Sequence, residues 1–388
     1  MMEQNCRIYL DFNSTTPVRP EVIEAMRPYW RDSFANTASR HSAGQEAWNA
    51  VETSREQVAA LVGTHPDDVI FTSGATEANY LALLGRFEAI ARKSKKTATV
   101  RVAVSAIEHP CVRACADEMA RRGATVQIIP VTPEGLVDYT FFDKNSKWDI
   151  VSVMAANHET GALQPLAEIS ARLDRRTTFF HTDAAQWAGR CSGDMMEWGV
   201  TAVSLSAHKM YGPKGVGALI VNRSVPIVPL FAGPQEGGYR GGTANLSGIV
   251  GFGAAAEWVK QEMNKEFNRL SDLRERLWNH LENSGLTVVR TIPPERCLPN
   301  TLHVRFPGMK GERVVDALDR LGICCSSGPA CTSGASEPSP VLMAMGMSEA
   351  EAWEGVRFSL GKDNIPIEIN EAGYRINRWV RENAAHVA

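Results

Sequence analysis

The sequence predicts an α/β fold in which helices cover both faces of a mostly parallel sheet, followed by a smaller α+β domain. Two features of the chain predict this fold. First, short apolar, β-rich runs alternate with segments of helical periodicity as far as about residue 221, a pattern typical of a parallel sheet buried between helices. Second, a long charged segment replaces this alternation after residue 257. We therefore expect a large domain at 14–257 and a small domain formed by 1–13 together with 258–388.

In chain order, the first strand is expected at 8–12, close to the amino terminus. The apolar runs of the large domain predict further strands at 69–72, 100–104, 150–154, 178–182, 202–205 and 217–221. Helical periodicity between them predicts one helix from about Ala75 and another at about 111–122. In the small domain we expect a charged bridging helix at about 258–283, a strand at 302–306 and helices near 312–321 and 367–383.

Composition indicates an ordinary globular enzyme-sized chain of 388 residues, with 44% hydrophobic residues and a net charge of −3. Acidic and basic residues are interspersed, which gives no reason to expect nucleic acid or a membrane as a direct partner. The amino terminus shows no charged and then apolar leader, and the apolar stretch 249–256 is too short to cross a bilayer. We therefore expect a cytoplasmic protein.

The eight cysteines do not form two Cys-x-x-Cys pairs, so a structural zinc site is not expected, and we predict no bound metal. Disulfides are not expected in a reducing compartment. Most of the cysteines are interpreted as small core residues, so any one of them proposed to act chemically needs separate support.

Four of the predicted strands end in unusually reactive sets of residues. Because ligands of parallel α/β sheets bind beyond the carboxyl ends of the strands, we expect these sets to outline one pocket. The sets are Thr72–Glu77, Ser105–His109, His181–Gln186 and Ser206–Lys209.

The first set, Thr-Ser-Gly-Ala-Thr-Glu, places small residues where a strand turns into a helix. The backbone N–H groups and the positive dipole end of such a helix favour a phosphate. The segment lacks the spacing of a nucleotide-triphosphate loop or a dinucleotide fold, which favours a single phosphate monoester. The same residues are also a common helix start, so that alternative stays open.

Asp183 and Lys209 suggest the chemistry of the pocket. A carboxylate at a strand end is what a pyridine nitrogen needs to stay protonated, although Asp183 and Gln186 would equally fit a helix-capping pair. A lysine in a partly desolvated pocket loses its proton readily and attacks an aldehyde to give a Schiff base. Most lysines merely face solvent, as we expect of Lys214.

These residues lie in a chain that, from Tyr9-Leu10-Asp11 to Gly355-Val356-Arg357-Phe358-Ser359, resembles the cysteine desulfurases. The resemblance implies a fold-type I, pyridoxal 5'-phosphate-dependent transferase with a seven-stranded, mostly parallel sheet in the large domain. It implies that Lys209 carries the cofactor as a Schiff base, that Asp183 pairs with its ring nitrogen and that His109 stacks on the ring. It further implies cofactor contacts from Ala75, Thr76, Asn157, Gln186, Ser206, His208 and Thr243.

The same resemblance implies a homodimer, in which Thr243 reaches the phosphate site of the neighbouring subunit. It also implies that Asn36, Asn157 and Arg357 bind the substrate, with Arg357 as the bidentate partner of its carboxylate.

The segment at about 324–340 is small and polar without apolar periodicity, which predicts a mobile loop. A thiol on such a loop can attack the sulfur of a bound cysteine and leave as a persulfide. No large apolar residue lies between Ser326 and Ser336, which argues against plain burial of Cys331, and the resemblance gives Cys331 the place of the nucleophile. Cys324 and Cys325 end an apolar run and are interpreted as structural.

The implied reaction converts L-cysteine to L-alanine. Lys209 removes the α-proton, Cys331 takes the sulfur, His109 assists proton transfer, and a sulfur-acceptor protein receives the persulfide. The chain differs from the usual family pattern at Thr37, His158 and Pro329. Pro329 stiffens the chain just before the nucleophile, so the choice of acceptor for iron–sulfur assembly, thiolation of tRNA or a cofactor, or DNA sulfur modification stays open.

Three alternatives remain. A selenocysteine lyase would share this framework without strictly needing Cys331. An aminotransferase of the same fold would need a 2-oxo acid and would leave the loop thiol without a purpose. A non-enzymatic scaffold would not need its cofactor residues, all of which are present.

Overall fold

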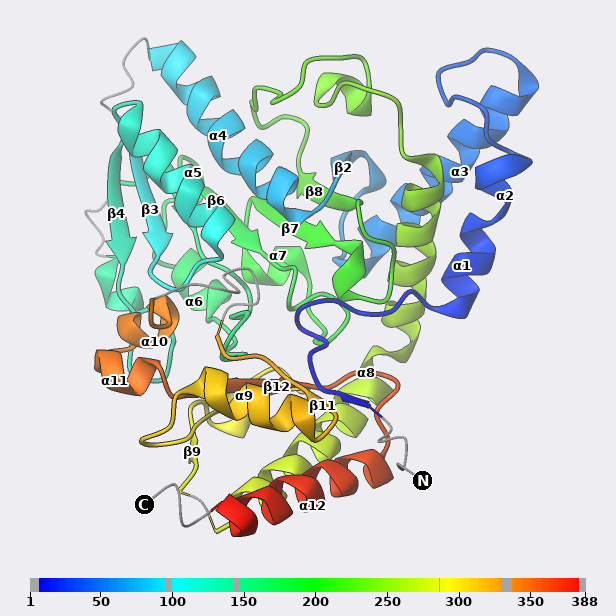
Figure 1. The fold of residues 1–388 in the computed structure, drawn as a ribbon. Coiled ribbons are helices and arrows are strands. Elements are labelled where there is room, and N and C mark those ends of the chain that lie inside the picture. Colours follow the sequence, from blue (N-terminus) through cyan, green and yellow to red (C-terminus); the bar gives the residue numbers. More distant parts are fainter. Residues whose placement is uncertain (1–6, 95–99, 143–146, 286, 329–336, 384–388) are drawn as a thin grey trace.

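A seven-stranded sheet forms the larger of two lobes in the computed structural model, which describes residues 7–94, 100–142, 147–285, 287–328 and 337–383 (Figure 1). Its strand order is β2-β8-β7-β6-β5-β3-β4. The strands are β2 (Val69–Thr72), β3 (Arg101–Ser105), β4 (Thr125–Ile129), β5 (Ile150–Ser152), β6 (Phe179–Asp183), β7 (Ala202–Ser206) and β8 (Gly217–Val221). Only β8 among them runs antiparallel to its neighbours, β2 and β7. The predicted α/β fold with a mostly parallel sheet is confirmed.

Helices cover both faces of this sheet because successive strand residues point to opposite sides. Val102 and Val104 join the core beneath α4 (Ala75–Ser94) and α5 (Pro110–Arg121), whereas Ala103 joins the core on the other face. That second face is covered by α1 (Pro20–Met26), α3 (Ser42–Leu61), α6 (Leu166–Ser170), α7 (Met195–Trp198) and the first half of α8 (Leu246–Glu282). A short helix, α2 (Pro28–Arg31), follows α1.

The smaller lobe has a separate apolar core. Its antiparallel sheet has the order β12-β10-β9, and the amino-terminal strand β1 pairs in parallel with β11. The elements of this lobe are β1 (Ile8–Tyr9), β9 (Val289–Arg290), β10 (Thr301–Arg305), α9 (Gly311–Arg320), β11 (Ile323–Cys324), α10 (Pro340–Ala344), α11 (Glu349–Ala352), β12 (Gly355–Ser359) and α12 (Pro366–Asn383).

The helix α8 connects the two lobes, and its beginning differs from the prediction. We expected a helix from about residue 258, but α8 begins at Leu246 and runs through that point without a break (Figure 1). The glycines in the first turns of α8 allow close packing: a Cβ at Gly253 would lie 2.7 Å from Ser54 Cα of α3. Tertiary packing thus outweighs the low helix propensity of glycine. The domain boundaries at 13/14 and 257/258 stay a prediction.

The strand β4 is absent from the sequence-based expectations. Only Ile129, its last residue, is buried, because β4 is the edge strand and most of its side chains face outward. A strand with one buried residue shows no regular alternation, so sequence patterning gives no signal for it.

The position of α8 in both cores leads to a prediction about stability. Leu277 is fully buried in the core of the small lobe, and truncation of a buried leucine leaves a cavity. We expect Leu277→Ala to lower the free energy of unfolding by about 2–5 kcal/mol. Urea denaturation followed by circular dichroism measures this change. Lys260→Ala, at an exposed position of the same helix, is the control, and equal effects of the two variants would contradict the assignment.

Candidate active site

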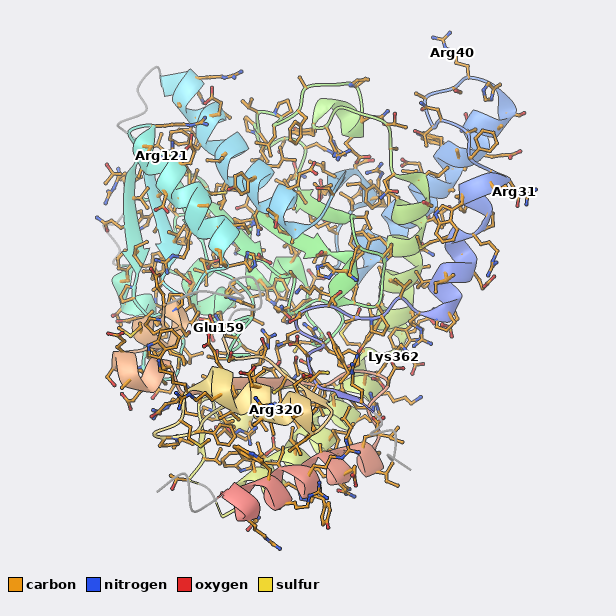
Figure 2. The ribbon with its side chains drawn as sticks, in the orientation of Figure 1. Arg31, Arg40, Arg121, Glu159, Arg320 and Lys362 are labelled. Carbon is orange, nitrogen blue, oxygen red and sulfur yellow. The ribbon has the colours of Figure 1, made fainter. Side chains whose placement is uncertain are left out.

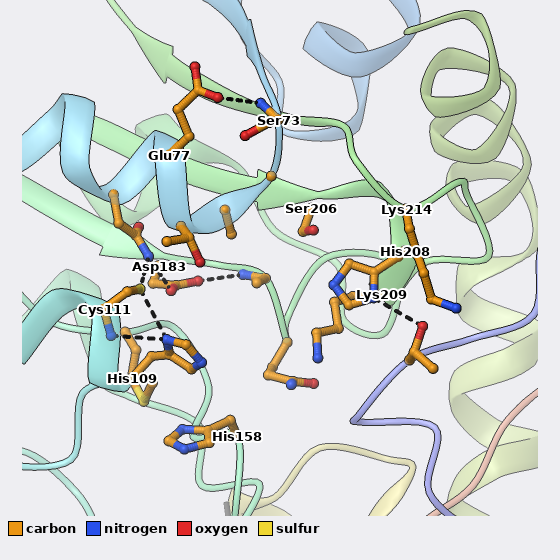
Figure 3. A pocket seen from close by; sticks show the side chains of 18 of the residues that line it. Ser73, Glu77, His109, Cys111, His158, Asp183, Ser206, His208, Lys209 and Lys214 are labelled. Atoms are coloured by element: carbon orange, nitrogen blue, oxygen red, sulfur yellow. Dashed lines mark hydrogen bonds between the residues drawn. The ribbon is translucent and has the colours of Figure 1, made fainter. Parts of the chain in front are cut away.

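A cavity of about 470 Å³ lies at the carboxyl ends of the parallel strands, and all four predicted residue sets contribute to its wall (Figure 3). This is the location that a parallel α/β sheet predicts for a ligand site. The predicted site residues that line it are Ala75, Thr76, His109, Asp183, Gln186, Ser206, His208 and Lys209.

One end of the cavity has the features of a phosphate site. The 20-residue helix α4 begins at Ala75, so Thr76 lies in its first turn, and Ser206 ends the neighbouring strand β7. The Nδ1 atom of His208 lies 3.1 Å from Thr15 Oγ1. Burial, followed by the charges of Lys209 and Lys214, lowers the pKa of His208 to about 4. Hydroxyl groups, a neutral imidazole and a helix amino terminus therefore surround this end.

Asp183 ends strand β6 on the cavity wall, and two hydrogen bonds fix its carboxylate. Its Oδ2 accepts from Asn79 Nδ2 at 2.7 Å and its Oδ1 accepts from Ala185 N at 2.9 Å. The alternative capping pair with Gln186 does not form, because the Gln186 side chain donates to Asn13 O and accepts from Arg190 Nη1. Asp183 therefore presents a fixed carboxylate to the cavity.

A second acid, Glu108, is buried beneath the cavity floor near Asp183. Its Oε1 accepts from Met154 N at 2.7 Å, and its Oε2 has no hydrogen-bond partner among the described residues. Burial, reinforced by the negative charge of Asp183, raises the pKa of Glu108 to about 8. Glu108 is thus protonated at neutral pH, and Asp183 does not have a second negative charge beside it.

Lys209 extends into the cavity from the short turn that joins β7 to β8. Its Nζ donates to Asn13 O at 2.6 Å and to Ser14 O at 2.8 Å, so the amine is held by backbone carbonyls of the amino-terminal segment. Lys214 is exposed, as expected, and lies at the rim of the same cavity. Lys214 is therefore the lysine that faces solvent, whereas Lys209 faces the cavity.

Two imidazole rings form the wall opposite the phosphate-like end. His109 caps the amino terminus of α5, and its Nδ1 lies 3.0 Å from Cys111 Sγ. The ring of His158 meets that of His109 edge to face, with 5.4 Å between the ring centroids. Figure 3 shows both rings on the side of the cavity away from Ser73 and Ser206.

Two predicted residues lie behind the cavity wall and do not line it. Asn157 is buried, and its Oδ1 accepts from the backbone N–H groups of Glu159 and Thr160 while its Nδ2 donates to Ile107 O. Arg357, on β12, donates to His158 O, to Asp11 Oδ1 at 2.7 Å and to Ser14 Oγ at 3.0 Å. Both side chains therefore already have polar partners within the fold.

Two more predicted residues lie on another surface of this chain. Asn36 and Thr243 are both exposed, and neither lines the cavity. Their sequence neighbours Thr37 and Ala244 line a separate groove with Trp48. Cys331 and Pro329 lie outside the described residues.

Sequence reasoning missed several residues of the site. His158 was noted only as a difference from the family pattern, although it lines the cavity. Asn79 and Cys111 join Asp183 to His109 through Asn79 Nδ2, which is 3.2 Å from Cys111 Sγ. The signal available for Cys111 was its proximity to His109 in the sequence, whereas Asn79 lies one helical turn after Thr76.

The set of groups around the cavity suits a phosphorylated aromatic aldehyde. An amine can form a Schiff base with the aldehyde, a carboxylate can pair with a ring nitrogen, and the amino terminus of α4 can bind the phosphate. The described residues therefore fit pyridoxal phosphate in kind and in arrangement.

Residues 8–371 match the family model for class-V aminotransferases. The chain belongs to this family. Among its relatives, the mitosomal cysteine desulfurase of Trachipleistophora hominis is 39% identical over 97% of this chain and 86% of its own length. The cysteine desulfurase IscS of Dictyoglomus turgidum is also 39% identical, over 94% of this chain and 92% of its own. Cysteine desulfurases are thus its near-full-length relatives in the class-V family.

The fold agrees with this family assignment. A solved structure described as a NifS-like protein superposes with a TM-score of 0.88 at 33% identity, and the match covers 97% of this chain and all of the other. A seven-stranded, mostly parallel sheet in a fold-type I transferase is therefore confirmed.

The described residues show neither a metal site nor a membrane-spanning helix. They contain no group of three or more His, Cys, Asp or Glu placed to hold a metal ion. None of the helices in the described part of the chain combines the length and apolarity needed to cross a membrane.

The buried Glu108 predicts how stability depends on pH. Its pKa of about 8 in the folded protein exceeds the ordinary 4.5, so between these values the folded state binds a proton that the unfolded state has released. The contribution of Glu108 to stability is therefore lost as pH rises from 4.5 to 8. Glu108→Gln keeps the acceptor for Met154 N but removes this titration.

We expect the stability of Glu108→Gln relative to the unmodified protein to increase between pH 5 and pH 8 by about 1 kcal/mol or more. Urea unfolding at several pH values measures the difference. Glu118→Gln, on α5 in an ion pair with Arg122, should not show this gain. A constant difference between Glu108→Gln and the unmodified protein across the range would refute a raised pKa.

Proposed function

We propose that this protein is a pyridoxal phosphate-dependent cysteine desulfurase that releases L-alanine from L-cysteine and retains the sulfur as a persulfide on Cys331. The observation that carries the proposal is the convergence of Lys209, Asp183 and the amino terminus of α4 on one cavity. Membership of a family whose near-full-length relatives are cysteine desulfurases supports the choice of reaction.

The cofactor would be held by residues from four strand ends. Lys209 would bind it covalently, Asp183 would face its ring nitrogen, and Thr76, Ser206 and His208 would bind its phosphate. When bound, pyridoxal phosphate supplies an electron sink for the pair left on the α-carbon of an amino acid. The charge of Asp183 sustains that chemistry, and the protonated state of Glu108 leaves the charge of Asp183 without a like-charged neighbour.

Proton transfer falls to Lys209 and His109. Once its amine is displaced by the substrate, Lys209 can take the α-proton, because its Nζ lies in the cavity within reach of the same ligand. His109, on the adjacent wall, would hold or move the proton of the substrate thiol. Its Nδ1 lies 3.0 Å from Cys111 Sγ, and the ring lies on the cavity wall.

Cys331 would perform the sulfur transfer. Its thiolate attacks the substrate sulfur, the bond between Cβ and sulfur breaks, and the departing carbon is protonated to complete L-alanine. The products are L-alanine and Cys331 persulfide, so no external oxidant or reductant is needed. A sulfur-acceptor protein then takes the terminal sulfur. For the substrate carboxylate we retain Arg357, whose Nη2 lies 3.0 Å from the cavity-lining Ser14 Oγ.

The roles of Lys209 and Cys331 can be separated by substitution. Lys209→Ala should abolish both the visible absorbance of the bound cofactor and the release of alanine. Cys331→Ala should keep the absorbance but reduce alanine release from L-cysteine by about 100-fold or more. Alanine and sulfide assays measure the activity, and mass spectrometry locates the persulfide.

Each outcome of this experiment has a distinct meaning. A colourless unmodified protein would refute the cofactor assignment. Alanine formation without a persulfide on Cys331 would refute the nucleophile. A third result is that Cys331→Ala loses activity on cysteine but keeps full activity on selenocysteine. That result would show that both substrates use the same cofactor site and that only the reaction with cysteine requires the Cys331 thiol.

The protein is further proposed to act as a homodimer in the cytoplasm. Trp30, Phe34, Trp48 and Phe231 are large apolar side chains that are exposed on this chain. Trp48 lines a groove with Gln235 and Gly237, in the segment that precedes Thr243. An apolar surface of this kind favours association with a second copy, which would carry Thr243 to the phosphate site of its partner.

Subunit complementation tests this arrangement. Lys209→Ala dimers should be inactive, and Thr243→Ala dimers should bind the cofactor more weakly. A heterodimer of the two variants contains one site with Lys209 from one subunit and Thr243 from the other, so mixing should restore activity at up to half of the sites. Activity titrations of co-refolded mixtures measure this recovery. If Thr243 served its own subunit, no site in the heterodimer would be intact and mixing would restore nothing.

A further inference from the structure

His158 is a buried polar residue on the cavity wall whose ring nitrogens have no hydrogen-bond partner among the described residues. A buried polar group without a partner costs about 1–3 kcal/mol, so native proteins rarely keep one without a reason. The side chain is 9% exposed. A ligand in the cavity is the partner that its position allows.

The surroundings of His158 keep its imidazole neutral. Burial lowers its pKa well below the usual value, and the positive charges of His109, Arg357 and Lys209 act in the same direction. Glu159 Oε1 lies 3.8 Å from His158 Nε2, which is too far for a hydrogen bond. A neutral imidazole has one N–H donor and one acceptor nitrogen. His158 therefore has a donor available for a ligand atom.

Asn157, the adjacent residue, is not available for the same role. Its Oδ1 accepts hydrogen bonds from Glu159 N, Thr160 N and Thr160 Oγ1, and its Nδ2 donates to Ile107 O. These contacts fold the segment 157–160 into a turn that directs residue 158, rather than 157, to the cavity. The sequence-based expectation placed the cofactor contact on Asn157.

The chemistry of pyridoxal phosphate indicates which of its atoms would face His158. Its phosphate arm and its ring hydroxyl lie on opposite sides of the axis from the ring nitrogen to the aldehyde carbon. Asp183 and Lys209 are the partners of the two ends of that axis, and Ser206 belongs to the phosphate side. The ring hydroxyl then points to the other side of the cavity, where His158 lies (Figure 3).

We propose that the N–H of His158 donates a hydrogen bond to the ring hydroxyl oxygen of bound pyridoxal phosphate. This inference rests on the proposed function, in which pyridoxal phosphate is the bound cofactor. A donor at this oxygen stabilises its anionic form, because hydrogen bonds to charged groups are stronger than those to neutral ones. Loss of the donor therefore raises the pH at which the bound chromophore loses its proton.

The test is an absorbance titration of the cofactor-loaded protein with four variants. His158→Ala should raise the midpoint of the visible transition by about 1 pH unit or more. His158→Asn and His158→Gln place an amide N–H near the positions of Nδ1 and Nε2, respectively, and one of them should return the midpoint towards that of the unmodified protein. Lys260→Ala, at an exposed position outside the cavity, serves as the control and should leave the midpoint unchanged.

Stability measurements without cofactor separate a contact from a structural role. His158→Ala removes a side chain whose ring nitrogens have no hydrogen-bond partner among the described residues, so it should lower the melting temperature less than Asn157→Ala does. Asn157→Ala removes several buried hydrogen bonds and should lower it. A large loss of stability in His158→Ala would show that its role lies in the fold.

Two results would overturn the inference. An unchanged midpoint in His158→Ala with cofactor bound would show that His158 does not contact the ring oxygen. A raised midpoint that neither amide variant reverses would show an indirect effect. If the unmodified protein lacks a cofactor band altogether, the proposed function fails first, and that result is distinct from both.

Discussion

The hydrogen bond between Asn79 and Asp183 holds the carboxylate on which the chemistry of the cavity depends. Asn79 lies on α4 and Asp183 ends β6, so this contact joins the helix that forms the phosphate-like end to the strand that carries the acid. The Oδ1 of Asp183 accepts from Ala185 N, which fixes the plane of the carboxyl group. The position of the carboxylate is thus set by one helix and one turn.

Burial also controls the protonation of two other acids, Glu108 and Glu159. Burial raises the pKa of Glu108 to about 8 and that of Glu159 to about 7, because neither has a cation close enough to offset the loss of water. An ionised carboxylate at Glu108 would repel the charge of Asp183. Burial thus keeps the proton on Glu108 near neutral pH, and the functional carboxylate is spared this repulsion.

Buried polar contacts place the small lobe against the cavity wall. Arg357 of β12 donates to Asp11 and to the carbonyl of His158, and Ser339 donates to Glu159 at 2.6 Å. Figure 2 shows Glu159 at the boundary between the two lobes. Ser339 caps α10, shortly after the segment that contains Cys331. The position of the small lobe therefore fixes the point from which the chain continues towards the proposed nucleophile.

Sequence patterns predicted the parts of the site that depend on local structure. Ser206, His208 and Lys209 follow a strand within a few residues, and the carboxyl ends of parallel strands must share one edge of the sheet. Asn36 and Thr243 were assigned through the family resemblance. Both are exposed on this chain, and local patterns do not encode which exposed residues take part in a site. The start of α8 was misplaced because packing against Ser54, far away in sequence, decides whether a glycine-rich segment is helical.

Asn157 and His158 show why residue type alone could not assign the cofactor contact. Both are polar and both are buried, so composition cannot distinguish them. The difference is that Asn157 accepts from the backbone N–H groups of Glu159 and Thr160. Gly161 adopts φ +79°, and a Cβ there would lie 2.7 Å from Cys297 Sγ. The turn is thus closed by an asparagine at one end and a glycine at the other. Its geometry leaves residue 158 facing the cavity, so the chemistry at this point follows from the backbone of the turn.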